Sequence, residues 1–471
     1  MQLNMRRKIK FPSHGSKVDL FLERKFGSKM FTYKKIFAML IPLILDHFFI
    51  NAINLLTTAM ISSSSQESVS AVSMIAPVSM IMWAIFSAIS VGGTVIVAQY
   101  KGSGEEAKIR NAAGQVMMAT FLVAIVSCII LVACSDVLVN RMFGVADRVV
   151  IHKARSYLIG VAISQIFLSI YMGAFAAFRG MGATKICLQL TIIINVIHLF
   201  ASMLFINVMH LDILGTTLSL NIARFIGSVV AVWLLMYPGS ILRIYPKNIF
   251  KIDRLILKSI FKLGIPFALE QVFFNAGSMI VQTYIVHLGT INIAANAIAN
   301  SAFTILYSAG LAVGTLATTI VGQCIGADDK ELAGQYGIKM VRLGTVMSIV
   351  SIVLLFPLMP VILNMYQAPP ETLSLIYKLL LIAIIPMPFF WSTSYVMPNV
   401  LRSAGDATFS SIVSLITMWA IRVGLGYIFA ITFGLGVYGL WICMGIEWAV
   451  RTLVFYLRYR SGIWLSKASI K

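Results

Sequence analysis

Long stretches of apolar residues recur along almost the whole chain and are separated by short polar segments. Each stretch is continuous and not alternating, which is the pattern of a buried helix and not of a half-exposed strand. A helix needs about 20 apolar residues to cross a bilayer core of ~30 Å. In lipid every backbone N–H and C=O must find a partner within the protein, which leaves helices and closed barrels. The pattern therefore predicts membrane-spanning helices.

The positions of these stretches predict an all-α polytopic membrane protein with about twelve transmembrane helices. The helices are expected near residues 36–61, 70–98, 112–134, 156–178, 187–209, 213–237, 258–288, 295–323, 337–363, 373–400, 409–433 and 437–458. The connections between them are short. Even the longest, residues 238–257, leaves no room for a soluble catalytic domain.

The two halves of the chain repeat each other. The segment from Ile41 to Ala52 aligns with the segment from Ile265 to Ala276, and half of the positions are identical. In this alignment Asp46 falls opposite Glu270, and Asn51 falls opposite Asn275. Three further matches keep nearly the same offset: Gln99-Tyr-Lys-Gly102 with Gln323-Cys-Ile-Gly326, Arg179-Gly-Met-Gly182 with Arg402-Ser-Ala-Gly405, and Gly215 with Gly439. The two Gln-x-x-Gly segments are expected to end helices, with glycine as the C-terminal cap.

Each half holds six expected helices, and an even number brings both halves into the membrane from the same side. The repeat therefore predicts two six-helix bundles, residues 36–237 and 258–458, related by a pseudo-two-fold axis along the membrane normal. Residues 238–257 are expected to form a cytoplasmic linker between the bundles. This architecture places a substrate cavity between the halves and suits alternating access, so it favours a transporter.

Charge adds an orientation to this picture. The chain is 59% hydrophobic and only 11% charged, whereas a soluble domain carries roughly 25% charged residues. A net charge of +20 would favour a nucleic-acid partner in a soluble protein. Here most of the 37 Lys and Arg residues, with Arg179 and Arg402 counted among the loop charges, fall on one side of the expected spans. The positive-inside rule then predicts a multi-pass protein of the plasma membrane with both termini cytoplasmic and no nucleic-acid partner.

The terminal segments lie outside the expected spans. Residues 1–35 hold ten Lys and Arg residues and are expected to be a topological anchor and solvated arm, with a regulatory or lipid-binding role as the alternative. Residues 459–471 form the second cytoplasmic tail. No cleaved signal peptide is expected. The five cysteines show no metal-ligand spacing and are interpreted as packing residues.

Three carboxylates lie inside the expected spans, namely Asp46, Glu270 and Glu447. A charged side chain in hydrocarbon is costly and persists where it faces a cavity, binds a cation or carries a proton. Asp46 and Glu270 occupy equivalent positions of the repeat, so they are the predicted sites for the coupling ion or a cationic substrate. Glu447 stands four residues before Arg451 and could be paired with it.

Other polar residues are candidates for the cavity. Thr57 shares a helix face with Asp46, and Asn54 lies beside that face. Asn275 follows Glu270 on the same expected helix. Arg224 and Arg422 either pair with the acids or face an interface. His47 and His198 could relay protons, although lone helical histidines are more often satisfied core residues.

The motifs together resemble the multidrug and toxic compound extrusion (MATE) transporters. The resemblance rests on Ile41-Pro…Asp46, Ile265-Pro…Glu270, the two Gln-x-x-Gly turns, Phe178-Arg-Gly-Met-Gly-Ala-Thr184 and Leu401-Arg-Ser-Ala-Gly-Asp406, and it spans about residues 40–455. It implies export of organic, often cationic, compounds or drugs in exchange for H⁺ or Na⁺. It implies no other cofactor and no catalysis, and a monomer is the expected functional unit.

The resemblance also assigns roles to particular residues. Asp46 matches the acid on the first helix of the family, and Glu270 matches the seventh-helix acid of the NorM-like branch. Asn195 matches a fifth-helix Asn of the DinF-like branch, but Leu199 stands where that branch has an Asp. The NorM-like acid on the tenth helix has no counterpart between Leu379 and Val400. The balance leans slightly to H⁺ coupling, with Na⁺ at Asp46 or Glu270 left open.

Two other classes of function compete with the cation-coupled antiporter. A flippase of lipid-linked oligosaccharide, from the same wider superfamily, would need a basic cavity to meet a pyrophosphate. Arg224 and Arg422, if both faced the central cavity, would favour that reading. A membrane-embedded enzyme or sensor would need a catalytic constellation or an attached soluble domain, and the sequence provides neither.

Overall fold

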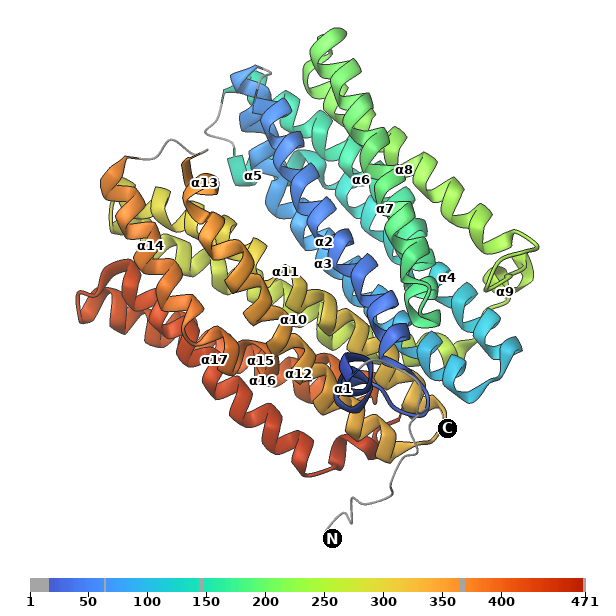
Figure 1. The fold of residues 1–471 in the computed structure, drawn as a ribbon. Coiled ribbons are helices and arrows are strands. Elements are labelled where there is room, and N and C mark those ends of the chain that lie inside the picture. The colour runs from blue at the N-terminus through green and yellow to red at the C-terminus, as the bar shows by residue number, and fades with distance from the viewer. Residues whose placement is uncertain (1–16, 63–64, 144–146, 365–368, 469–471) are drawn as a thin grey trace.

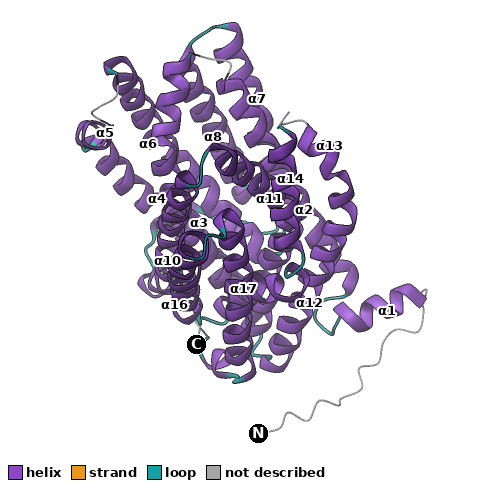
Figure 2. Ribbon diagram, turned by 90° about the vertical axis from the view of Figure 1, so that its left-hand side faces the viewer, coloured by secondary structure: helices purple, strands orange, loops and turns teal. Residues whose placement is uncertain are grey.

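The computed structural model describes residues 17–62, 65–143, 147–364 and 369–468. Within these ranges every regular element is a helix and no strand occurs (Figure 2). The first and last described helices, α1 (Lys17–Phe26) and η6 (Ile463–Ser466), lie at the same end of the molecule (Figure 1). That end is called the terminal face below, and the opposite end is called the far face.

The N-terminal lobe contains six long helices. They are α2 (Tyr33–Ser62), α3 (Gln66–Ser103), α4 (Glu106–Ala133), α6 (Arg148–Met181), α7 (Thr184–Ser202, continued by the π-helical η1, Met203–Val208) and α8 (Asp212–Met236), with the short α5 (Ser135–Phe143) between α4 and α6. The linker to the second lobe forms one turn, α9 (Pro246–Phe250).

The C-terminal lobe follows the same order. Its first three spans are α10 (Arg254–His287), α11 (Thr290–Gly326) and α12 (Lys330–Leu355), and α12 is extended by η2 (Phe356–Leu358) and α13 (Met359–Asn364). The fourth span is a broken helix made of α14 (Pro370–Ile384), η3 (Met387–Trp391) and α15 (Ser392–Ser403). The fifth consists of α16 (Ala407–Thr417), η4 (Met418–Leu425) and η5 (Ile428–Thr432), and the sixth is α17 (Gly436–Arg460). The terminal segments add α1 (Lys17–Phe26) and η6 (Ile463–Ser466).

Twelve of these units are the predicted membrane spans. Within the described ranges, ten are long and apolar enough to cross a bilayer, and Pro370–Ile384 with Met387–Ser403 adds an eleventh that bends by 41°. The twelfth is α10, a helix of 34 residues that packs along α3 and α16 and carries Glu270. Each predicted helix is present; the observed helices begin one to eight residues before the predicted starts and end between one residue before and five residues after the predicted ends.

The repeat in the sequence is a repeat in the fold. At Gly215 an added Cβ would meet the backbone carbonyl of Phe205, and at Gly439 it would meet the backbone of Phe429. Each glycine lies near the start of the last helix of its lobe and contacts the end of the helix before it. The same close approach in both lobes explains why both positions are glycine and confirms the two six-helix bundles.

The two lobes pack together toward the terminal face. The second half of α3 runs against α10 and α11 of the other lobe, and a Cβ at Gly92 would lie 2.8 Å from the carbonyl oxygen of Ile260. Nearer the terminal face, Gly102 lies against the carbonyl of Gln323, while Gly326 lies against the carbonyl of Gln99. The Gln-x-x-Gly turns of the two lobes therefore touch each other, backbone to backbone.

The glutamines of these turns each reach a helix end in the opposite lobe. Gln99 Nε2 donates to the carbonyl of Ser403 at 2.7 Å, and Gln323 Nε2 donates to the carbonyl of Gly180 at 2.9 Å. Thr319 Oγ1 adds a third bond, to the carbonyl of Arg179 at 2.9 Å. Helix capping, which the sequence favoured for this motif, holds for Gly104 at the end of α3 (φ +77°). The glutamines and the inner glycines instead hold the lobes together.

The N-terminal segment is more than a solvated arm. Phe26 and Phe31 are buried in a cluster with the start of α2 and with α11, α12 and α15 of the C-terminal lobe. The hydroxyl of Tyr336 donates to the carbonyl of Phe31 at 2.8 Å and accepts from its N–H at 3.1 Å. Residues 26–31 thus attach the first helix of one lobe to the core of the other.

We expect Gly326→Ala to open the terminal face, because its Cβ would overlap the carbonyl of Gln99 and backbone cannot rotate away. Overpacking of this kind costs roughly 1–3 kcal/mol. The rate of maleimide labelling at Cys324, which is buried beside this contact, should rise in a chain whose other cysteines are alanine. Gly334→Ala is the matched control, since its nearest neighbour would be the Tyr459 hydroxyl at an ordinary 3.7 Å. Equal labelling rates in the two variants would contradict the contact.

Candidate functional site

The first acid predicted from the sequence, Asp46, lies in an ion pair. Its Oδ2 atom is 3.2 Å from Nη2 of Arg179, at the end of α6, and its side chain is 1% exposed. Its other oxygen, Oδ1, is buried and accepts no hydrogen bond from the described protein groups. The Nε2 atom of His47 is buried as well and has no described partner. One oxygen is therefore held by the guanidinium, while the other is an unused acceptor in a dry site.

The second acid, Glu270, lies in the equivalent pair of the other lobe. Its Oε2 is 2.5 Å from Nη2 of Arg402, at the end of α15, and both side chains are less than a tenth exposed. The Arg402 guanidinium also lies 4.1 Å from the centre of the Phe267 ring. Charge-assisted hydrogen bonds between Arg and carboxylate are among the strongest in proteins. Each lobe thus contains one such pair between its first helix and the end of its fourth.

Both arginines sit next to the bonds that join the lobes. The residue after Arg179 is Gly180, whose carbonyl accepts from Gln323, and the residue after Arg402 is Ser403, whose carbonyl accepts from Gln99. The arrangement therefore occurs twice, once in each lobe. Each arginine of an ion pair is therefore one residue along the chain from a carbonyl whose hydrogen bond holds the lobes together at the terminal face.

This placement corrects one element of the sequence interpretation. Arg179 and Arg402 were counted among loop charges on the cytoplasmic side, but their side chains are 19% and 6% exposed and serve the buried acids. The repeat contained a signal for this role, since both arginines recur at matching positions, as the acids do. Gln99 and Gln323 carried the same signal and were interpreted only as parts of a helix end.

Glu447 has two partners. Arg451 Nη1, one turn along α17, is 3.3 Å from Glu447 Oε1, as its spacing predicted, and Arg422 Nε on η4 is 2.6 Å from Oε2. The Glu447 side chain is fully buried. Arg451 also donates to the Ser414 hydroxyl at 2.9 Å. One carboxylate therefore faces two guanidinium groups.

Among the described side chains, Asn195, Asn275 and Arg224 make no hydrogen bond or ion pair with Asp46 or Glu270. Asn195 donates to the carbonyl of Thr191 on its own helix at 2.8 Å, and Asn275 is half-buried on α10. Arg224 donates to the Ser164 hydroxyl at 2.6 Å inside the N-terminal lobe, whereas Arg422 is in the C-terminal lobe. The side chains of Asn54 and Thr57 lie outside the described residues. Across the described ranges, no group of three His, Cys, Asp or Glu side chains could hold a metal ion.

The architecture and its paired acids define the class of protein as a membrane transporter of two repeated lobes. The family model described as MatE matches residues 42–204 and 266–428, one match in each lobe. The chain belongs to this family, as the resemblance in the sequence predicted. Members of the family are transporters and not enzymes.

Relatives are spread over several bacteria. The chain is 27% identical over 417 residues to the “Uncharacterized transporter YisQ” of Bacillus subtilis, covering 87% of this chain and 90% of that one. It is 24% identical over 429 residues to the “Probable multidrug resistance protein NorM” of Thermotoga maritima, covering 87% and 88%.

Solved structures share the fold. A MOP superfamily transporter from Pyrococcus furiosus, described as having a binding pocket of reverse polarity, superposes with a TM-score of 0.83 at 19% identity, over 92% of this chain and 97% of that one. An outward-facing multidrug resistance MATE transporter of the same superfamily gives 0.83 at 18% identity, over 92% and 96%.

Removing one partner of a buried pair should be far more harmful than removing both. We expect Arg402→Met to lower the free energy of unfolding by about 3 kcal/mol or more, because Glu270 would be left charged and unpaired in a dry site. Adding Glu270→Gln to the same chain should recover most of that loss. Thermal unfolding in detergent measures both effects.

The control for this pair is an exposed one. Arg110→Met removes a partner of Glu106 in a surface pair of 2.9 Å, and such pairs contribute only about 0–1 kcal/mol. A double variant at Glu270 and Arg402 that is no more stable than Arg402→Met alone would show that the two groups do not interact.

Proposed function

We propose that this chain is a proton-coupled exporter of organic compounds in the plasma membrane, with the terminal face toward the cytoplasm. The observation that supports this most is the duplicated arrangement at Asp46 and Glu270. Each acid holds an arginine, and the residue after that arginine accepts a hydrogen bond from a glutamine of the opposite lobe. An ion that acts on the acids thereby acts on the closure between the lobes.

The proposed mechanism starts from the unused oxygen of Asp46. A proton arriving at Oδ1 neutralises the carboxylate and removes its attraction for Arg179. The guanidinium, left without its counter-charge in a dry site, then moves toward water. Its helix end moves with it, which weakens the bonds that Thr319 and Gln323 make to the carbonyls of Arg179 and Gly180. The terminal face opens, and release of the proton closes it again.

Protons suit this site better than Na⁺. Na⁺ is a hard cation that takes several oxygen ligands, and beside Asp46 it would stand next to the positive charge of Arg179. A proton needs a single lone pair, which Oδ1 provides. The same reasoning applies to Glu270, where Arg402 is even closer. We therefore favour H⁺ as the coupling ion and a monomer as the functional unit, since each pair is completed within one chain.

Drug-like organic compounds are the proposed substrates, because relatives are named multidrug resistance proteins. The sequence predicted Asp46 and Glu270 as sites for the coupling ion or a cationic substrate. Both acids are already paired with arginine, so they no longer favour a cationic substrate over a neutral or anionic one. The lipid-linked oligosaccharide flippase would be favoured if Arg224 and Arg422 both faced the central cavity. Arg224 instead donates to Ser164 within the N-terminal lobe, and Arg422 pairs with Glu447 within the C-terminal lobe, which weakens that alternative.

Transport in proteoliposomes tests this proposal. With the purified protein reconstituted, an imposed pH gradient should drive flux of an organic probe, either ethidium or naphthalenesulfonate, and an imposed Na⁺ gradient at equal pH should not. Asp46→Asn and Glu270→Gln should each reduce pH-driven flux to the level of empty liposomes, since neither amide can exchange a proton. Flux driven only by Na⁺ would overturn the choice of ion.

The matched control is a carboxylate outside the site. Glu105→Gln removes an exposed acid that pairs with Lys108 and should leave pH-driven flux unchanged. If Asp46→Asn and Glu270→Gln retain the flux of this control, the two ion pairs are structural and the proposed coupling is wrong.

A further inference from the structure

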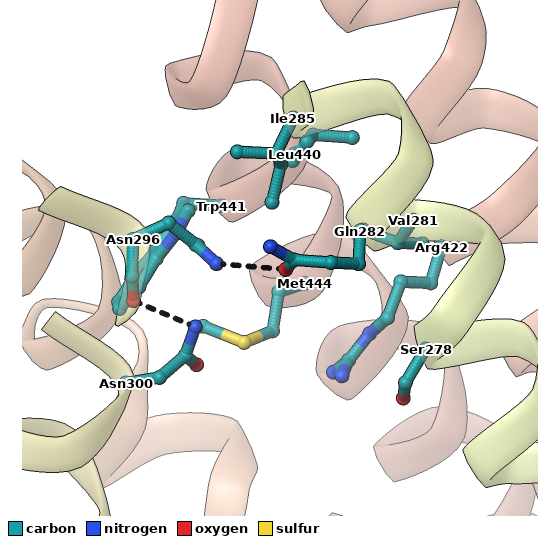
Figure 3. A pocket seen from close by; sticks show the side chains of 10 residues that line it. All are labelled: Ser278, Val281, Gln282, Ile285, Asn296, Asn300, Arg422, Leu440, Trp441 and Met444. Carbon is teal, nitrogen blue, oxygen red and sulfur yellow. Dashed lines mark hydrogen bonds between the residues drawn. The ribbon is translucent and has the colours of Figure 1, made fainter. Parts of the chain in front are cut away.

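A cavity of about 250 Å³ opens in the C-terminal lobe, away from the contact between the lobes. Its walls come from α10, α11, η4 and α17, in the parts of α10, α11 and α17 that lie toward the far face. Val281, Ile285, Leu440, Trp441 and Met444 supply apolar and aromatic surface, while Ser278, Gln282, Asn296, Asn300 and Arg422 supply the polar groups (Figure 3). Arg422 is the single charged residue in this lining.

The charge of Arg422 is not balanced. It shares Glu447 with Arg451, so two guanidinium groups compensate one carboxylate and a net charge of +1 remains. Glu447 is 0% exposed, whereas the Arg422 side chain keeps 15% of its surface. The Nη2 atom of Arg422 has no hydrogen-bond acceptor among the described side chains, and Tyr395 and the ring of Phe274 lie against the guanidinium. The cluster therefore keeps one positive charge, and of its two guanidinium groups the more exposed one, that of Arg422, lines the cavity.

A relay of hydrogen bonds fixes which atoms the amides present. The indole N–H of Trp441 can only donate, and it is 3.0 Å from Asn296 Oδ1. This leaves Asn296 Nδ2 as the donor to Gln282 Oε1 at 3.4 Å. The Gln282 side chain must then present its NH₂ group to the cavity. In Figure 3 the Gln282 amide and the Arg422 guanidinium extend into the same space, toward Asn296 and Asn300.

The cluster is specific to the C-terminal lobe and does not follow the repeat. At the offset that brings Gly215 onto Gly439, Arg422 corresponds to His198, Glu447 to Ala223 and Arg451 to Gly227. Scaffolding required by the fold would occur in both lobes, as the pairs of Asp46 and Glu270 do. An uncompensated cation inside a membrane protein is costly and marks a binding function by default.

We infer that this cavity binds an organic anion, with an acidic oxygen group on Arg422 and Gln282 and an apolar or aromatic body against Trp441 and Met444. Arg is suited to this task because its planar donors match the oxygens of carboxylate, sulfonate or phosphate. One negative charge on the ligand cancels the net +1 of the cluster. As a statement about substrate class the inference rests on the proposed export function, but the binding itself requires no gradient.

Equilibrium binding to the purified full-length protein tests this inference. Naphthalenesulfonate and naphthyltrimethylammonium have the same aromatic body and opposite charges. Titration calorimetry should give a dissociation constant at least about tenfold lower for the sulfonate, since a unit charge beside an unbalanced guanidinium is worth that much at an effective dielectric constant of ~20. Tighter binding of the cation, or binding of neither probe to protein with a cooperative thermal transition, would overturn the inference.

Two variants locate the site. Gln282→Glu keeps the oxygen that accepts from Asn296 but places a carboxylate beside Arg422, and it should weaken sulfonate binding by at least about tenfold. Gln66→Glu adds the same charge at an exposed position of the other lobe and should change nothing. Arg422→Gln leaves Glu447 with Arg451 and should also abolish the preference for the anion. Equal affinities in Gln282→Glu and Gln66→Glu would place the binding elsewhere and reject the cavity.

Two outcomes distinguish the anion site from the proposed antiport and from the binding of a lipid. If sulfonate binds with these properties but no pH-driven flux occurs, the anion site stands and the proposed antiport fails. If the sulfonate binds only after co-purified anionic lipid has been removed, the cavity holds a lipid phosphate in the membrane, and the soluble organic anion is rejected.

Discussion

Water is absent from the hydrocarbon core of a bilayer, so a charged side chain there must find its partner within the protein. The rest of this structure depends on how that requirement is met. Each of the three carboxylates inside the spans is held by arginine. The pairs of Asp46 with Arg179 and of Glu270 with Arg402 join helices that are distant in the sequence, whereas Glu447 pairs with Arg422 on the preceding helix and with Arg451 on its own. An ion pair of this kind cannot separate unless the helices packed around it move, so it is suited to controlling how those helices are arranged.

The ion pairs of Asp46 and Glu270 lie next to the hydrogen bonds that join the two lobes. Arg179 and Arg402 each precede a carbonyl that is bonded to a glutamine of the opposite lobe. The lobes themselves touch through glycines whose backbone leaves no space for a Cβ. In the proposed mechanism, a small shift at an acid moves one of these contacts between a closed and an open state, because packed interfaces are not continuously deformable. The duplication of the arrangement means that each lobe can act on the other.

Glu447, the third carboxylate, differs from Asp46 and Glu270 because it pairs with two arginines, so one positive charge is left uncompensated. The N-terminal lobe also holds a cation, Arg224, which donates to the Ser164 hydroxyl and has no ion pair among the described residues. The polar interior of the lobes is thus less acidic than the three acids alone would indicate. Charge balance, and not the count of acids, decides which ligands such an interior favours.

The sequence by itself determined the helices, their number, the repeat and the side chains that had to be buried. These properties are local: about 20 apolar residues in lipid have no alternative to a helix, and the repeat is visible as matching letters such as Asp46 and Glu270. The ends of the helices and the breaks near Pro386 and in η4 were less well determined, because neighbouring helices decide them.

Only the tertiary structure decided the partners. Asp46 and Arg179 are 133 residues apart in the sequence, and the hydrogen-bonded residues Gln99 and Ser403 are 304 residues apart. Arg179 and Arg402 stand at the ends of apolar stretches, where they resemble ordinary loop cations. The sequence shows how far a residue lies from an apolar stretch, but it does not show which acid faces that residue. Whether a buried charge is balanced is a property of three-dimensional neighbours. That is why the acids could be found from the sequence, while the balance of charge around them could not.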